Sequence, residues 1–381
     1  MSAAYLDNCA TTKVCDEAAA AALRAMTSCY GNPSSLHRLG VEAEAVLRGA
    51  RFEIAQSLCC EKAEIYFTSG GTEANNLAIL GAVSALRRRG KRIVTTMVEH
   101  SSVTKPIEKL EKEGFEVIWL RPNADGCINE TDILSAVNSE TILVSIMLVN
   151  NETGAIMPVC AARRAVKAAG APALIHCDAV QAFGKLKVNP LKLGVDLLTL
   201  SAHKIHAPKG AGALYISKSA RINPLFLGGE QEKGIRPGTE PVPAIAGFGE
   251  AARLSREGFL EHIKTIIALK DHCIQLLSPL PYITFNSPIH SASHILNVSV
   301  KGIRSETMLH YLEAREIYIS SGSACGKGAK SHVLTAMGMP QDIIDSALRI
   351  SFSHYNTNED IERLYEGIIA GNMELVHRSV V

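Results

Sequence analysis

The sequence has almost no net charge and no long apolar run. Its 381 residues include 39 lysines and arginines and 38 aspartates and glutamates, which gives a formal net charge of +1. Proteins that bind nucleic acid or anionic membranes through overall charge need a basic excess, so neither partner is expected. No apolar stretch reaches the roughly 18 residues of a membrane span, and the first residues lack the pattern of a signal peptide. We therefore expect a cytoplasmic protein.

Closely paired cysteines are missing as well. The ten cysteines are scattered along the chain, and no two are spaced as Cys-x-x-Cys. Adjacent Cys59 and Cys60 follow a helix-forming run, where buried thiols are more common than zinc ligands. The sequence therefore predicts no metal site.

What the sequence does contain is an alternation of short β-branched runs with helical segments. Several runs are apolar at consecutive positions, as in strands that are covered on both faces. We expect strands at 92–98, 116–120, 141–149, 173–177, 196–201 and 212–217, separated for the most part by helices that include 101–113, 130–137 and 160–169. This alternation predicts a doubly wound α/β sheet.

The pattern changes near residue 238. The segment RPGTEPVP is rich in proline and glycine, a long helical pattern follows from about 243 to 277, and the rest has the mixture of a compact α+β domain. A chain of 381 residues exceeds one ordinary core. We expect a large domain at 15–255, and a smaller one formed by 1–14 together with 256–381.

A glycine-containing turn precedes one expected helix. In TSGGTEANN, Gly70, Gly71 and Thr72 follow the apolar run IYF and open a helix that extends to Leu86. Free backbone N–H groups at such a position can bind a phosphate. Alternatively, the glycines only turn the chain and Thr72 caps the helix. The dinucleotide-binding pattern GxGxxG is absent here, which weakens a nucleotide interpretation.

A carboxylate and a lysine follow two of the expected strands. Asp178 comes directly after ALIHC, at the sheet edge where α/β proteins bind ligands, and it could pair with a cationic ring nitrogen. Lys204 lies just beyond DLLTL, where burial could lower its pKa and permit Schiff-base formation. Taken singly, Asp178 could equally be a helix cap or ion-pair partner, and Lys204 a solvated surface charge.

Taken together, these motifs resemble those of a known enzyme family. The chain resembles the class V aminotransferases, and most closely cysteine desulfurases of the NifS/IscS type, in SAHKIHAPKGAGALY, HCDAVQAFGKLKV, TSGGTEANNLAI, VNNETGAIMPV, MVEHSSV, GGEQEKGIRPGT and SSGSAC. The similarity extends from YLDNCATT to LRISFSHYNT. It implies the fold of fold-type I pyridoxal phosphate (PLP) enzymes: a mostly parallel seven-stranded sheet with a smaller α+β C-terminal domain.

The resemblance also implies a role for individual residues. Lys204 would bind PLP covalently, Asp178 would pair with its ring nitrogen, Gln181 would contact its hydroxyl and His100 would stack on its ring. The cofactor phosphate would be held by Gly71, Thr72, Ser201, His203 and, from the partner subunit of a homodimer, Thr239. The substrate carboxylate would be bound by Asn151 and Arg349, with Asn150 left open as an alternative to Asn151.

The reaction implied is the conversion of L-cysteine to L-alanine, with the sulfur left as a persulfide on Cys325 of SSGSAC. Lys204, Cys325 and His100 would be catalytic. Nearby Lys327, Lys330 or a protonated His100 could lower the pKa of the Cys325 thiol and so favour the thiolate. The sulfur would pass to an acceptor or iron–sulfur scaffold protein, for clusters, thiolated tRNA or a cofactor. Three alternatives stay open: a selenocysteine lyase, an aminotransferase of another small amino acid, and an inactive scaffold homologue.

Overall fold

The computed structural model describes residues 3–321 and 330–377 and is built around a seven-stranded sheet. The sheet has the strand order β2-β8-β7-β6-β5-β3-β4. Its strands are β2 (Ile65–Thr68), β3 (Arg92–Thr96), β4 (Glu116–Leu120), β5 (Thr141–Ser145), β6 (Leu174–Asp178), β7 (Leu197–Ser201) and β8 (Gly212–Ile216). Only β8 runs antiparallel to its neighbours β2 and β7. The predicted mostly parallel sheet is confirmed.

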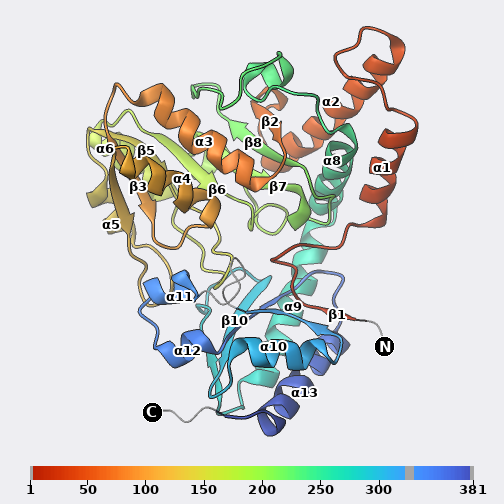
Figure 1. Cartoon of the computed structure of the whole chain (residues 1–381), viewed down its shortest axis with the longest axis vertical. Helices are drawn as coiled ribbons and strands as arrows, with labels where there is room; N and C mark the ends of the chain where they lie inside the picture. The colour runs from red at the N-terminus through yellow and green to blue at the C-terminus, as the bar shows by residue number, and fades with distance from the viewer. Residues whose placement is uncertain (1–2, 322–329, 378–381) are drawn as a thin grey trace.

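Helices enclose this sheet because its strands are apolar on both faces. Every residue of β5, β7 and β8 is buried. The helix α3 lies across β5, β6, β7 and β8, and Figure 1 shows it in front of the sheet. The α-helices before residue 238 are α1 (Asp16–Thr27), α2 (Arg38–Leu58), α3 (Gly71–Leu86), α4 (Ser101–Lys112), α5 (Glu130–Ala136), α6 (Cys160–Ala169) and α7 (Pro190–Leu193).

A second, antiparallel sheet forms the lower part of the molecule in Figure 1. It has the order β12-β13-β10-β9, and a separate parallel pair joins β1 to β11. These strands are β1 (Ala4–Tyr5), β9 (Ile283–Phe285), β10 (Ile295–Val300), β11 (Ile317–Tyr318), β12 (Ser320–Ser321) and β13 (Ala347–Ser351). The helices packed around them are α10 (Ser305–Glu313), α11 (His332–Ala336), α12 (Gln341–Asp345) and α13 (Asn358–Glu374).

The N-terminal segment belongs to this lower part. Ala4 and Leu6 are fully buried in the same apolar core as residues of α9 (Phe259–Leu277), β10 and α13. The next residues, 7–12, then run between the two sheets, where Thr12 N–H donates to the His203 carbonyl oxygen at 3.0 Å. The N-terminus therefore connects both halves of the fold.

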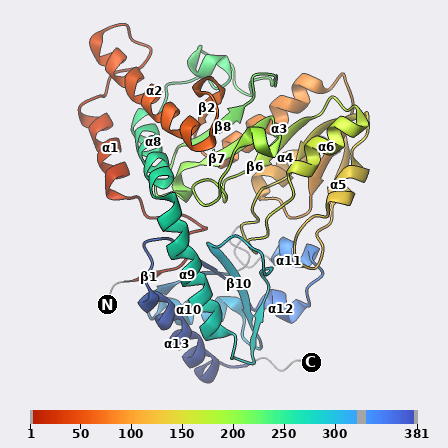
Figure 2. The same cartoon turned by 180° about the vertical axis from the view of Figure 1, so that it is seen from behind.

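The single long helix expected at 243–277 is two helices. The first, α8 (Val242–Glu257), packs on α1 and α2, and the second, α9 (Phe259–Leu277), packs on α13. Gly258 separates them, and glycine is the residue with the weakest helix propensity after proline. Figure 2 shows the pair running from the large sheet down to the small one. The sequence prediction was wrong at this point.

Two general features bear on function. Within residues 3–321 and 330–377, no helix combines the length and apolar character that a membrane span needs. The nine cysteines in those ranges are all free thiols, so no disulfide constrains that part of the fold.

Candidate active site

A cavity of about 290 Å³ lies where the carboxyl ends of β6 and β7 meet the smaller sheet. Ten of the predicted site residues line it: Gly71, Thr72, His100, Asn151, Asp178, Gln181, Ser201, His203, Lys204 and Arg349. Two others do not. Thr239 is exposed on the segment before α8 and is not among the lining residues of its own subunit's cavity. Cys325 lies outside the described residues.

The glycine turn forms one wall of the cavity. Gly70 precedes α3 with a φ of 156° that side chains rarely allow, and a Cβ on Gly71 would come within 2.9 Å of a Val180 methyl carbon. No side chain caps the start of α3. The alternative that Thr72 caps this helix is therefore wrong, and the first-turn N–H groups remain available to an anion.

Asp178 is held by neutral hydrogen-bond donors. Its Oδ2 accepts from Asn75 Nδ2 at 2.7 Å and its Oδ1 from the Val180 N–H at 2.9 Å. No ion pair involves Asp178 among the residues described, although only 6% of its surface is exposed. A buried carboxylate in this position favours a cationic ligand.

His100 directly precedes α4 and faces the same cavity. Its Nδ1 lies 2.7 Å from the Ser102 hydroxyl, which also accepts from Asn75 Nδ2 at 2.8 Å. Burial lowers the pKa of His100, so the neutral imidazole predominates at pH 7. The ring is thus suited to stacking and hydrogen bonding, and the protonated form, one of three possible sources of positive charge near Cys325, is a minor species at that pH.

Lys204 ends a short 3₁₀ helix, Ala202–Lys204, that directly follows β7. Its Nζ donates to the carbonyl oxygens of Cys9 and Ala10, the latter at 2.9 Å. Burial is the main cause that lowers the pKa of Lys204 to about 8. The N-terminal segment therefore supplies the hydrogen-bond acceptors that orient this amine, while desolvation increases the neutral, reactive fraction.

We expect Lys204 in the cofactor-free protein to react with amine reagents at lower pH than other lysines. With a pKa of about 8, about a quarter of it is neutral at pH 7.5, against roughly one part in a thousand for an ordinary lysine. Pulse acylation followed by mass spectrometry should show a Lys204 profile rising through pH 8. A profile that coincides with that of exposed Lys209 would contradict the argument.

Three further polar groups face the cavity from the large sheet. Gln181 donates from Nε2 to the Cys9 carbonyl oxygen at 3.0 Å, and Ser201 follows at the end of β7. His203 Nδ1 lies 3.1 Å from the Thr11 hydroxyl. Burial, helped by the nearby Lys204 amine, lowers the pKa of His203 to about 4. His203 can therefore donate a hydrogen bond but adds no positive charge at neutral pH.

The structure distinguishes the two neighbouring asparagines. Asn150 is fully buried, and its side chain is used within the turn: Nδ2 donates to Val98 O, and Oδ1 accepts from the Glu152 and Thr153 N–H groups. Asn151 lines the cavity, and its Oδ1 has no partner in the described part of the chain. Asn151 is thus the one placed to contact a ligand.

Arg349 reaches the cavity from the smaller sheet. Its Nη1 donates to the Asn151 carbonyl oxygen at 3.0 Å and its Nη2 to Asp7 Oδ1 at 2.9 Å, while Nε has no described partner. The residue is 1% exposed. Asp7 therefore orients a guanidinium that still has donor capacity left for a carboxylate.

Four buried polar atoms without hydrogen-bond partners indicate that these residues fit PLP and its substrate. Ser201 Oγ, Gln181 Oε1, Asn151 Oδ1 and Arg349 Nε are all buried, and none has a hydrogen-bond partner within residues 3–321 and 330–377. Unpaired buried polar atoms are rare in native proteins, and these four surround one cavity. The phosphate of PLP would accept from Ser201 Oγ, its ring hydroxyl would donate to Gln181 Oε1, and the carboxylate of a substrate would accept from Arg349 Nε.

Sequence reasoning missed several residues of this site. Asn75 and Ser102 support Asp178 and His100, and Asp7 supports Arg349. Asn75 lies three residues after Thr72, so helical spacing within TEANN was an available signal for it. Nothing local in YLDNCATT indicates that Asp7 pairs with an arginine 342 positions away.

Comparison with known proteins identifies the family of this chain. Residues 4–364 match the family model of the class-V aminotransferases. The chain is 42% identical over 367 residues to the cysteine desulfurase IscS of Methanosarcina thermophila, covering 96% of this chain and 90% of that protein. It is 38% identical to the cysteine desulfurase IscS of Photorhabdus laumondii, covering 99% and 92% of the two chains.

Solved structures show the same relationship. A NifS-like protein superposes with a TM-score of 0.93 at 36% identity, covering 98% of this chain and all of that one. A structure described as SspA in complex with cysteine superposes with a TM-score of 0.81 at 31% identity, covering 93% and 99%. With its seven-stranded sheet, its buried lysine and these matches, the chain belongs to the class-V aminotransferase family, whose members use PLP, and within it to the NifS/IscS-like cysteine desulfurases.

Proposed function

We propose that this protein is a PLP-dependent cysteine desulfurase that converts L-cysteine to L-alanine and leaves the sulfur as a persulfide on Cys325. The observation that carries the proposal is the position of Lys204: a buried amine whose pKa is about 8, in one cavity with Asp178 and Arg349. Relatives named cysteine desulfurases, at about 40% identity over nearly the whole chain, support the same activity.

The cofactor would lie between the two sheets. Gly71, Thr72, Ser201 and His203 would hold its phosphate, Gln181 its hydroxyl, Asp178 its ring nitrogen and Lys204 its aldehyde carbon. His100 would cover one ring face. When bound, PLP supplies an electron sink that stabilises negative charge at the substrate Cα.

The chain's own residues supply binding and proton transfer. Arg349 and Asn151 would orient the substrate carboxylate, and Asp7 keeps the guanidinium in place. The neutral Lys204 amine would remove the Cα proton, since its pKa lies near the working pH. The Cys325 thiolate would attack the substrate sulfur, forming an S–S bond as the C–S bond breaks. The released electron pair stays on the three-carbon fragment, which is protonated to alanine.

Other features of the proposal concern assembly. Residues 15–255 would form the cofactor-binding domain, and 1–14 with 256–381 the smaller domain that carries the cysteine loop. The protein would act as a cytoplasmic homodimer, with Thr239 completing the partner subunit's phosphate site. A sulfur-acceptor or iron–sulfur scaffold protein would receive the persulfide sulfur, for cluster assembly or tRNA thiolation.

Product analysis tests the activity. The purified protein, supplied with PLP, L-cysteine and a dithiol, should release alanine and sulfide in equal amounts without any keto acid. Transfer of the amino group to an added keto acid would instead indicate an aminotransferase. A much higher rate with L-selenocysteine would indicate a selenocysteine lyase. PLP binding without turnover would leave the scaffold interpretation.

We expect Arg349→Lys to weaken substrate binding more than chemistry. Lysine keeps the positive charge but loses the planar fork that can hold Asp7 and a carboxylate together. One lost hydrogen bond to a charged group costs about 1.5–3 kcal/mol, so KM for L-cysteine should rise about 10- to 100-fold with a much smaller change in kcat. Steady-state kinetics give both constants, and an unchanged KM would exclude Arg349 from carboxylate binding.

We expect Asn75→Leu to weaken PLP binding. The change removes the donor at 2.7 Å from Asp178 Oδ2 and leaves a buried carboxylate with one hydrogen bond fewer. The expected loss is roughly tenfold in PLP affinity, because hydrogen bonds to charged groups contribute about 1.5–3 kcal/mol. Equilibrium dialysis measures it. Asn76→Leu is the matched control, since the Asn76 side chain contacts backbone oxygens on α3 and α4 rather than Asp178.

A further inference from the structure

Residues 230–238, called the strap here, hold an unusual backbone. Glu232 and Lys233 are consecutive non-glycine residues with φ of 46° and 56°, in the left-handed region. Side chains rarely adopt this conformation, and it persists only where surrounding contacts enforce it. The strap also lacks any long helix or strand of its own. Two backbone hydrogen bonds, from Gly234 N–H to Glu230 O and from Ile235 N–H to Glu232 O, hold it locally, and side-chain contacts fix it to the rest of the subunit.

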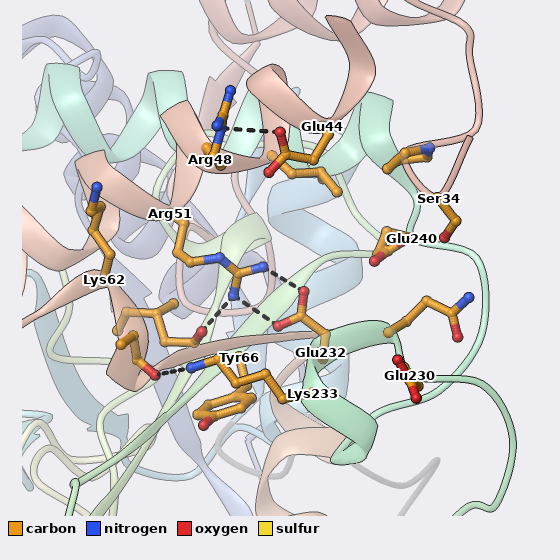
Figure 3. Close-up of a pocket in the computed structure, with 15 residues that line it drawn as sticks. Ser34, Glu44, Arg48, Arg51, Lys62, Tyr66, Glu230, Glu232, Lys233 and Glu240 are labelled. Atoms are coloured by element: carbon orange, nitrogen blue, oxygen red, sulfur yellow. Dashed lines mark hydrogen bonds and ion pairs between the residues drawn. The ribbon is translucent and has the colours of Figure 1, made fainter. Parts of the chain in front are cut away.

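A buried ion pair supplies the first of these contacts, as Figure 3 shows. Arg51 of α2 donates from Nη1 to Glu232 Oε2 at 2.8 Å and from Nη2 to Oε1 at 2.6 Å. Glu232 Oε2 also accepts from the Phe67 N–H at 2.9 Å, and only 1% of this side chain is exposed. The Arg51 guanidinium lies over the Phe67 ring and donates to Ile65 O. Glu232 is thus fixed by three hydrogen bonds, two from Arg51 of α2 and one from the Phe67 N–H of β2.

Further contacts tie the strap to the neighbouring elements. Lys233 Nζ donates to Ala63 O at 2.8 Å, visible in Figure 3 beside Tyr66. Arg236 Nε donates to Glu73 Oε1 at 2.8 Å, and Glu73 Oε2 accepts from the Ser69 N–H. Gln231 Oε1 accepts from the Gly238 N–H at 3.1 Å, which closes the strap on itself. The strap is therefore fastened at both ends.

These contacts determine the position of Thr239, the residue that follows the strap. Gly238 has a φ of 109°, and Thr239 after it is exposed and outside the cavity of its own subunit. A threonine on an otherwise irregular segment has a defined position only if the segment before it is rigid. The strap provides that rigidity from contacts made entirely within one subunit.

We propose that Glu232 and Arg51 are positioning residues for the cofactor of the partner subunit: their ion pair locks the strap so that Thr239 is presented to the phosphate in the other subunit's site. This inference rests on the proposed function, because it requires a PLP-binding dimer. The ion pair lies outside the cavity of its own subunit, and its proposed effect is on PLP binding in the other subunit.

Mixed dimers test the direction of this effect. Two differently tagged copies are co-expressed, and one always carries Lys204→Ala, so that only the other copy can bind PLP covalently. In the first dimer, Glu232→Gln is on the Lys204→Ala copy, whose strap serves the intact site. In the second dimer, Glu232→Gln is on the copy with the intact site. The measurement is the rate at which PLP is lost from the purified dimer.

We expect PLP loss to be faster in the first dimer by about tenfold, the effect of one lost charged hydrogen bond. The second dimer should lose PLP at the rate of a dimer without Glu232→Gln. Faster loss in the second dimer only, equal rates in both, or no change in either would overturn the proposal. Loss of PLP binding in wild-type homodimers would overturn the proposed function as well, so the two failures are distinguishable.

Two more variants separate positioning from folding. Glu230→Gln removes the same charge from an exposed strap residue that forms no ion pair in the described chain, and it should leave PLP loss unchanged in both dimers. Arg51→Lys keeps the positive charge but loses the planar guanidinium that binds both Glu232 oxygens. It should therefore speed PLP loss in the first dimer and not in the second, as Glu232→Gln does. This variant tests the proposal even if the Glu232→Gln copy folds poorly. An Arg51→Lys effect confined to its own subunit's site would count against the proposal.

Discussion

Replacing Lys204 with alanine should lower desulfurase activity by at least about 10³-fold, because positioned acid–base groups contribute about 10²–10⁴-fold and this one also binds the cofactor covalently. Burial lowers the pKa of the Lys204 amine to about 8, and its hydrogen bonds go to the carbonyl oxygens of Cys9 and Ala10. No other lysine lines the cavity within the described residues.

The measurement is alanine release from L-cysteine at saturating PLP, with the visible spectrum of the bound cofactor as a second readout. Lys209→Ala is the matched control, since Lys209 lies on the same segment and is exposed. It should keep near-normal activity and spectrum. A Lys204→Ala protein that retains more than about a tenth of the activity would rule out Lys204 as the base.

The Cys325→Ala variant should retain PLP binding and lose sulfide production almost completely. Cys325 would provide the only S–S bond-forming nucleophile in the proposed reaction, whereas cofactor and substrate binding depend on the residues that line the cavity. A thiolate is needed for this attack, and alanine offers no replacement. We therefore expect a loss of at least about 10²-fold in sulfide release with an unchanged cofactor spectrum.

Cys160→Ala provides the comparison, because Cys160 is an exposed free thiol at the start of α6. The Cys160→Ala variant should release sulfide at the same rate as the unmodified protein. If Cys325→Ala still yields sulfide at the normal rate, the sulfur leaves by a different route, as in a lyase. If both variants are inactive, the loss reflects thiol chemistry elsewhere and not the proposed persulfide.

Much of the fold was predictable because the signals are local. Strands that are covered on both faces need uninterrupted apolar runs, so the sequence places β3 to β8 within a few residues, whereas β2 was not among the expected strands. Asp178 and Lys204 follow such runs directly, which puts them at one sheet edge. The helix break at Gly258 was missed because one glycine does not by itself end a helical pattern.

The site's supporting contacts depend on pairs of residues far apart in the chain. Asp7 and Arg349 meet only because β1 packs beside the smaller sheet, and Asn75 meets Asp178 because α3 crosses β6. The local sequence pattern around each of these residues does not predict which distant residue it contacts. The choice of Asn151 over Asn150 likewise rests on which side chain the turn uses for its own hydrogen bonds.

The sequence by itself determined the α/β class, the family and the reactive residue types, because these follow from apolar periodicity and from motifs that each occupy a short stretch of chain. The tertiary structure alone decided the ionisation of Lys204, His100 and His203, since burial shifts their pKa values and burial depends on every element packed around them. It also decided that the strap is fixed to α2 and β2. The left-handed backbone at Glu232 and the ion pair that holds it join residues far apart in the chain, so neither can be read from a short stretch of sequence.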